Sequence, residues 1–128
     1  VNTGEKGYMT VLANEFIGTL FLTIAYRIIL EFLEVGLTFT TSTSTTMYPQ
    51  PTQIPFFFAF FLLTLFCINQ SGAHFNPAVT CTFMLKRKSP ISYVFGGTLM
   101  AVHFLGAISG ALIAWFLTKS GGSLTIYG

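Results

Sequence analysis

The chain has 128 residues, of which 52% are hydrophobic and only 8% are charged, whereas about 25% of an ordinary soluble domain is charged. This composition excludes an ordinary soluble protein and predicts an integral membrane protein. The formal net charge of +2 is small and scattered, so we expect no nucleic acid among the partners. No nucleophile–base pair and no metal-ligand spacing is visible, so we expect neither an enzyme nor a bound cofactor or metal.

The first apolar segment covers about residues 11–34 and is long enough to span a membrane. No small-residue cleavage pattern follows it, so we expect a retained helix rather than a removable signal. Glu15 lies within this segment, and a carboxylate inside a span usually faces a bundle interior or a cavity. The alternative is an interfacial Glu15 that reaches the lipid headgroups.

Arg27 and Glu31 stand four residues apart near the far end of the same segment. This spacing places both side chains on one helix face and predicts an ion pair near the opposite interface. The alternative for Arg27 is a contact with a neighbouring protein subunit.

The second apolar segment covers about residues 55–69 and follows a stretch, residues 35–53, whose threonine, serine and proline content is typical of a loop. Its apolar run is about 14 residues long, fewer than the ~17–25 that a transmembrane helix needs. We therefore expect the residues that follow to complete the crossing.

A loop that turns directly into a helix start is predicted at residues 71–80. Asn76 is a preferred N-cap, and Pro77 suits the first helical position because its missing N–H needs no partner there. The apolar residues continue only to Leu85, about 13 Å of helix and less than half of a ~30 Å hydrocarbon core. Residues 70–85 are thus expected to form a re-entrant loop and half-helix, which must line a cavity or be buried in protein.

A basic turn, Lys86-Arg87-Lys88, precedes the third apolar segment, about residues 91–118. Positive residues favour the cytoplasmic side or an equivalent compartment such as a mitochondrial matrix. This orientation predicts an inside N-terminus and an outside C-terminus.

Residues 71–80, SGAHFNPAVT, resemble the first signature loop of the aquaporins and aquaglyceroporins, the major intrinsic protein family. Residues 76–78 match its asparagine-proline-alanine motif. Residues 13–19 resemble the opening of its first helix, and His103 stands where its third helix usually has glutamine. His103 is interpreted either as a neutral packed histidine or as a pH-sensitive gate. The resemblance implies an all-α half-aquaporin of three transmembrane helices, one re-entrant loop and one half-helix.

The half-helix predicted from Pro77 carries a partial positive charge at its N-terminus, which attracts a water oxygen and repels protons and cations. Asn76 adds an amide donor at that point. Three carbonyl groups upstream are expected to accept hydrogen bonds from permeating water. The predicted pore-lining residues in the loop are therefore Asn76, Gly72, Ala73 and His74.

Further site residues are implied by the resemblance. Glu15 corresponds to the family's buried glutamate, which braces the backbone of the signature loop. Pro77 and Ala78 support that loop as part of the motif. Counting back from Asn76, the residue that contributes to the family's selectivity constriction is Phe56, and an alternative alignment selects Phe60.

The family pattern has two signature loops in inverted repeats, and this chain contains one. The first hypothesis is a half-channel that pairs with a second aquaporin-like half and passes water or a small neutral solute. The second is a non-conducting accessory subunit of a larger membrane assembly, such as a mitochondrial respiratory complex. Both imply membrane lipid as a partner and an integral multi-pass protein, with the mitochondrial inner membrane among the candidate locations.

Overall fold

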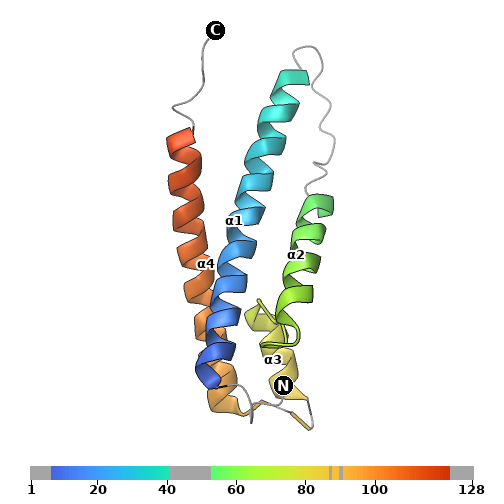
Figure 1. Cartoon of the computed structure of the whole chain (residues 1–128), viewed down its shortest axis with the longest axis vertical. Helices are drawn as coiled ribbons and strands as arrows, with labels where there is room; N and C mark the ends of the chain where they lie inside the picture. Colours follow the sequence, from blue (N-terminus) through green and yellow to red (C-terminus); the bar gives the residue numbers. More distant parts are fainter. Residues whose placement is uncertain (1–6, 41–52, 87, 90, 122–128) are drawn as a thin grey trace.

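The computed structural model describes residues 7–40, 53–86, 88–89 and 91–121, and within these ranges the chain is helical and contains no strand. Four helices follow one another: α1 (Tyr8–Thr40), α2 (Gln53–Cys67), α3 (Pro77–Leu85) and α4 (Tyr93–Gly121). Figure 1 shows α1 and α4 running in the same direction and α2 running against them. Helix α2 ends partway along the bundle, and α3 continues to the end at which α1 and α4 begin.

Two helices are long and apolar enough to cross a membrane, over Tyr8–Glu31 and Tyr93–Lys119. Only 22% and 28% of their most apolar windows are buried, whereas the core helix of a soluble protein would be mostly buried. The apolar part of α2, Ile54–Cys67, is shorter. Large exposed apolar patches of this kind mark membrane or protein contacts, so the described part of the chain is helical and presents the apolar surface expected of a membrane protein.

Helix α1 continues beyond the end that the sequence predicts. Residues 35–40, expected in a loop, are helical, while the rest of that expected loop, residues 41–52, lies outside the described residues. Threonine lowers helix propensity by only a few tenths of a kcal/mol, and adding residues to an existing helix is far easier than starting one. The threonine-rich composition was therefore a poor indicator of where the helix ends. Proline is a much stronger helix breaker, and the first proline comes only at position 49.

Helices α1 and α4 approach each other closely at two glycines that stand four residues apart. A Cβ atom added at Gly106 would lie 2.8 Å from the carbonyl oxygen of Phe16, and one added at Gly110 would lie 2.6 Å from that of Leu20. Small residues at this spacing allow the backbones of membrane helices to approach closely. Any larger side chain would force the two helices apart.

The two shorter helices each pack on one long helix. Helix α2 contacts α1, where the rings of Phe56 and Tyr26 meet edge to face at 5.3 Å. Helix α3 contacts α4, where Met84 occupies the space above Gly96. Among the described helices, α2 contacts neither α3 nor α4, so one side of α3 is left uncovered.

The predicted ion pair on α1 is present. Arg27 Nη2 lies 3.2 Å from Glu31 Oε2, and the two side chains are 47% and 40% exposed. The pair therefore lies on the outer surface of α1, at the end of its apolar stretch.

Candidate functional site

The loop between α2 and α3, residues 71–76, has an unusual backbone. Gly72, Ala73 and Phe75 have φ angles of 97°, 52° and 47°. The left-handed region costs a residue with a Cβ about 1–2 kcal/mol, so surrounding contacts must hold Ala73 and Phe75 in place. The first of these is local, since Ser71 Oγ accepts a hydrogen bond from Ala73 N at 3.3 Å.

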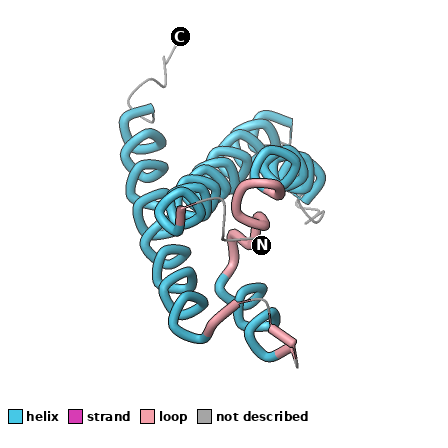
Figure 2. Tube along the Cα trace, turned by 60° about the horizontal axis from the view of Figure 1, so that its bottom comes forward, coloured by secondary structure: helices cyan, strands magenta, loops and turns pink. Residues whose placement is uncertain are grey.

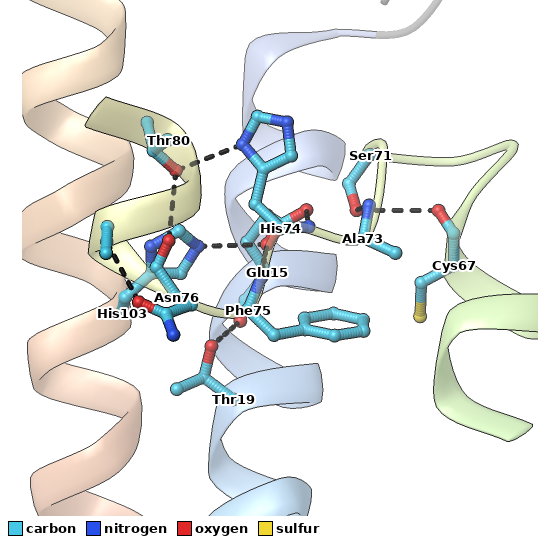
Figure 3. Close-up of polar contacts among 11 residues, drawn as sticks. Glu15, Thr19, Cys67, Ser71, Ala73, His74, Phe75, Asn76, Thr80 and His103 are labelled. Atoms are coloured by element: carbon cyan, nitrogen blue, oxygen red, sulfur yellow. Dashed lines mark hydrogen bonds and ion pairs between the residues drawn. The ribbon is translucent and has the colours of Figure 1, made fainter. Parts of the chain in front are cut away.

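Glu15 of α1 provides the main support of loop 71–76 (Figure 3). Its Oε1 accepts a hydrogen bond from His74 N at 3.0 Å, and its Oε2 accepts one from Phe75 N at 2.8 Å. Glu15 is completely buried. One carboxylate therefore satisfies two consecutive backbone N–H groups that the left-handed loop leaves without helical or sheet partners.

His103 of α4 supplies a third hydrogen bond to the same carboxylate. Its Nε2 lies 2.9 Å from Glu15 Oε2, and both side chains are 0% exposed. Because an ionised carboxylate only accepts hydrogen bonds, Nε2 is assigned as the donor. His103 Nδ1 is buried and has no hydrogen-bond partner among the described residues. Sequence reasoning missed this pairing, although each residue stood out as a polar group inside an apolar span.

The ring of Phe75 packs against α1 at Gly18, where no side chain is present. Its ring occupies the space in which a side chain at Gly18 would lie, and it is only 4% exposed. The ring of Phe60 on α2 meets it edge to face at 6.5 Å. The signal for this contact was present in the sequence as Gly18, which lies among the larger residues of the stretch 16–22.

Asn76 caps α3 with its side chain. Its Oδ1 accepts a hydrogen bond from Ala78 N at 2.9 Å, and Pro77 occupies the first turn. Asn76 is exposed, and no described residue hydrogen-bonds to its Nδ2. The amide therefore points its donor group away from the helix, where it is available to another molecule. Pro77 and Ala78 complete the first turn that this cap organises.

The side chain of His74 turns into the protein. Its Nδ1 lies 3.0 Å from Thr80 Oγ1, and its ring stacks on Phe83 with centroids 4.8 Å apart and planes 5° apart. The role predicted for His74 therefore falls to its carbonyl group, because its N–H donates to Glu15 and its ring Nδ1 pairs with Thr80. Within the part of the chain that the structure describes, no hydrogen bond reaches the carbonyl oxygens of Gly72, Ala73 or His74.

Phe56 lies apart from the other predicted site residues. It packs on Tyr26, which is about 16 Å along α1 from Glu15 at the helical rise of 1.5 Å per residue. The alternative residue, Phe60, lies beside Phe75 in the loop. A contribution of Phe56 to a constriction therefore stays a prediction.

The polar groups of this region are arranged around Glu15 and the start of α3. Among the described residues, no group of three His, Cys, Asp or Glu side chains is placed to hold a metal ion. Buried donors converge on Glu15, while Asn76 offers a free donor at the start of α3.

The family model described as Major intrinsic protein matches residues 4–126. No curated protein and no solved structure matches the chain.

Proposed function

Because the chain belongs to the major intrinsic protein family, a family of membrane channels and not of enzymes, we propose that it supplies one half of a pore for water or small neutral solutes. A complementary half, outside these 128 residues, completes the pore. The observation that carries the proposal is Asn76, which caps α3 through Oδ1 and leaves its Nδ2 group unpaired by any described residue.

The depth of the loop supports this proposal. His103, which contacts the loop support Glu15, lies ten positions after Tyr93, or about 15 Å along α4. That distance is half of a ~30 Å hydrocarbon core. Irregular backbone at such a depth is tolerated only when it is buried in protein or lines a water-filled cavity.

The chemistry of the loop suits water. The N-terminus of α3 carries about half a positive charge, which attracts the water oxygen and opposes the passage of cations and protons. Asn76 Nδ2 donates to the same oxygen. The carbonyl groups of Gly72, Ala73 and His74 accept hydrogen bonds from the water molecules that follow. Donor and acceptors together orient water in single file.

A distinct second half suits the pore better than an inverted second copy. The sequence contains one signature loop, and one side of α3 faces no other described helix, so a single copy of this fold does not enclose a pore. Transporter and channel halves of this kind are related by an axis in the membrane plane, so a second copy would have to insert upside down. Inversion would move the basic residues 86–88 across the membrane, against the positive-inside preference.

The second candidate function is a non-conducting accessory subunit of a larger membrane assembly. The observation in its favour is the Arg27–Glu31 pair, which is exposed on the surface of α1. An exposed charged pair at the end of an apolar helix is suited to contact with another subunit.

Osmotic shrinkage of proteoliposomes separates these two functions. The complex that contains the full chain is purified in mild detergent, its native mass identifies what accompanies the chain, and water permeability is measured by stopped-flow light scattering. We expect permeability well above that of bare lipid. Asn76→Leu should lower the protein-dependent part roughly tenfold, because a permeating water loses a hydrogen bond of about 1–1.5 kcal/mol.

The matched control is Asn14→Leu, since the Asn14 side chain is exposed and, among the described residues, hydrogen-bonds to Thr10 O on α1 alone. This variant should conduct like the unmodified chain, and both variants should assemble to the same native mass. Permeability equal to that of bare lipid for the unmodified complex would establish the accessory function instead.

A further inference from the structure

Helices α1 and α4 lie side by side, run in the same direction (Figure 1) and are fixed in register. Glu15 Oε2 meets His103 Nε2 at 2.9 Å across a sequence separation of 88. The rings of Tyr8 and Phe95 meet edge to face at 5.0 Å, in the same register to within one residue. Because both helices rise by about 1.5 Å per residue, each residue of α4 lies about level with the residue 88 positions earlier in α1.

Continuing this register toward the ends of the two apolar stretches brings polar and aromatic side chains to one level. Trp115 lies level with Arg27, and Lys119 lies level with Glu31. Arg27 and Glu31 form an exposed ion pair, and the ammonium group of Lys119 lies 4.6 Å from the centroid of the Trp115 ring. Tyr26 is exposed beside Arg27. We call these five residues the far belt.

The opposite ends of the two helices carry a second group of exposed aromatic residues. Tyr8 and Tyr93 are the first residues of α1 and α4, and both are exposed; we call them the near belt. Tyrosine and tryptophan are enriched where hydrocarbon meets headgroups, because one end of the ring is apolar and the other is polar. Lysine and arginine near helix ends extend to the same level. The two belts therefore have the composition expected at the two surfaces of a bilayer.

Apolar side chains cover the outer surface of both helices between the belts. The large exposed ones include Phe104, Leu105, Ile108 and Leu112 on α4 and Ile17 and Phe21 on α1. Figure 2 shows α4 at the edge of the molecule, with no other described helix on its outer side. Helix α3 packs on a different face of α4, at Gly96, so this surface is separate from the side of α3 that the complementary half of the pore would cover.

The distance between the belts limits the thickness of the bilayer that this surface matches. Tyr8 and Tyr26 are 18 positions apart, about 27 Å of helix. Phe95, which contacts Tyr8, is 20 positions from Trp115, about 30 Å of helix. Tilt can only reduce the depth that a helix of given length spans. We propose that the outer surface of α1 and α4 is fitted to a bilayer whose hydrocarbon layer is at most about 30 Å thick, with the far belt among the headgroups of one leaflet.

The fixed register makes the response to thickness asymmetric. The Glu15–His103 contact and the close approach at Gly106 and Gly110 prevent α1 and α4 from sliding past each other, so the pair adapts by tilting as a unit. Tilting accommodates a thinner bilayer but cannot lengthen the span for a thicker one. Excess thickness therefore destabilises the pair, and the surface fits thin or average membranes better than sterol-rich ones, whose hydrocarbon layer is about 32–33 Å thick.

The test measures thermal stability as bilayer thickness increases. The full chain is reconstituted in phosphatidylcholine vesicles with monounsaturated acyl chains of about 14 to 22 carbons, which give thicknesses below and above about 30 Å, and unfolding is followed by circular dichroism. We expect a constant unfolding temperature up to about 30 Å and a progressive fall in thicker bilayers. A temperature that keeps rising in the thickest bilayers would overturn the proposal. Neither result depends on conduction, so both are independent of the proposed pore.

Trp115, the single tryptophan of the sequence, reports the depth of the far belt directly. Its fluorescence should be quenched most by phospholipids brominated near the headgroup end of the acyl chain, and least by phospholipids brominated near the chain terminus. The reverse order would place Trp115 at the bilayer centre and contradict the proposal.

A double variant should raise the thickness limit. Arg27→Leu with Trp115→Leu leaves Glu31 and Lys119, four residues further along each helix, to mark the end of the apolar surface. The fall in unfolding temperature should then begin in bilayers about 6 Å thicker.

The matched control is Asn14→Leu with Phe116→Leu. Asn14 is exposed between the belts, and Phe116 is an exposed apolar neighbour of Trp115, so the control changes the same two helices without moving either belt. It should leave the thickness limit unchanged, and an equal shift in both double variants would rule out the far belt as the boundary. Loss of a co-purifying polypeptide from the Arg27→Leu variant, with the thickness limit unchanged, would assign the far belt to a subunit contact instead.

Discussion

Where α1 crosses α4 at Gly106 and Gly110, the contact depends on shape, because glycine lets the carbonyl oxygens of Phe16 and Leu20 approach. Loop 71–76 depends instead on hydrogen bonds, and three of them end on the two oxygens of Glu15. In the helix pair, many small contacts each contribute part of the stability. In the loop, one side chain contributes most of the stability, so single substitutions should affect the two regions very differently.

The largest effect is expected for Glu15→Leu. It leaves the N–H groups of His74 and Phe75 and the ring of His103 buried without their acceptor. Removing one partner from a buried charged network costs about 3–5 kcal/mol. Unfolding in mixed detergent micelles should show this loss, and hydrogen exchange should show loss of protection at His74 and Phe75.

Glu31→Leu is the control for Glu15→Leu, because Glu31 pairs with Arg27 on an exposed surface. An exposed pair contributes at most about 1 kcal/mol. Similar losses for the two glutamates would show that the loop does not depend on Glu15.

An intermediate effect is expected for Gly110→Leu. The added side chain would meet the backbone oxygen of Leu20, which lies 2.6 Å from the position of a Cβ atom, and backbone cannot yield as a flexible side chain can. Overpacking of this kind costs about 1–3 kcal/mol. Gly97→Leu is the matched control, since nothing lies within 4 Å of its Cβ position. A Gly110 variant as stable as the Gly97 variant would rule out close packing at this crossing.

The smallest effect, and one of unusual sign, is expected for Ala73→Gly. Ala73 has a φ angle of 52°, and glycine removes the left-handed penalty while adding unfolded-state entropy, so stability should stay constant or rise by up to about 1 kcal/mol. The same change at Ala101, an exposed residue inside α4, should cost about 0.5–1 kcal/mol. Equal losses at both positions in a thermal unfolding series would show that Ala73 is not strained.

The helix α3 could be predicted from local sequence because its boundaries have local causes. Asn76 and Pro77 mark its start, and the apolar run ends at Leu85, directly before Lys86. The end of α1 had no comparable signal, since threonine-rich sequence weakens a helix without stopping it. The sequence therefore predicted the short helix better than the long one.

Loop 71–76 was predictable in its location but not in its conformation. A positive φ at Phe75 opposes the local preference of a bulky residue, and it is maintained by Gly18 and Glu15 from another helix. The pairing of Glu15 with His103 joins residues 88 positions apart. Sequence reasoning identified both as unusual polar residues, but only the three-dimensional arrangement shows that they are partners.

The position of Glu15 also bears on how the chain is assembled during translation. Its partners in the loop follow it by 59 and 60 positions, and His103 follows it by 88. At a synthesis rate of about 5–20 residues per second, His103 emerges roughly 4–18 s after Glu15. Until then Glu15 lacks at least one of its three hydrogen-bond donors, so we expect this buried acid to be accommodated during membrane insertion before α4 is in place.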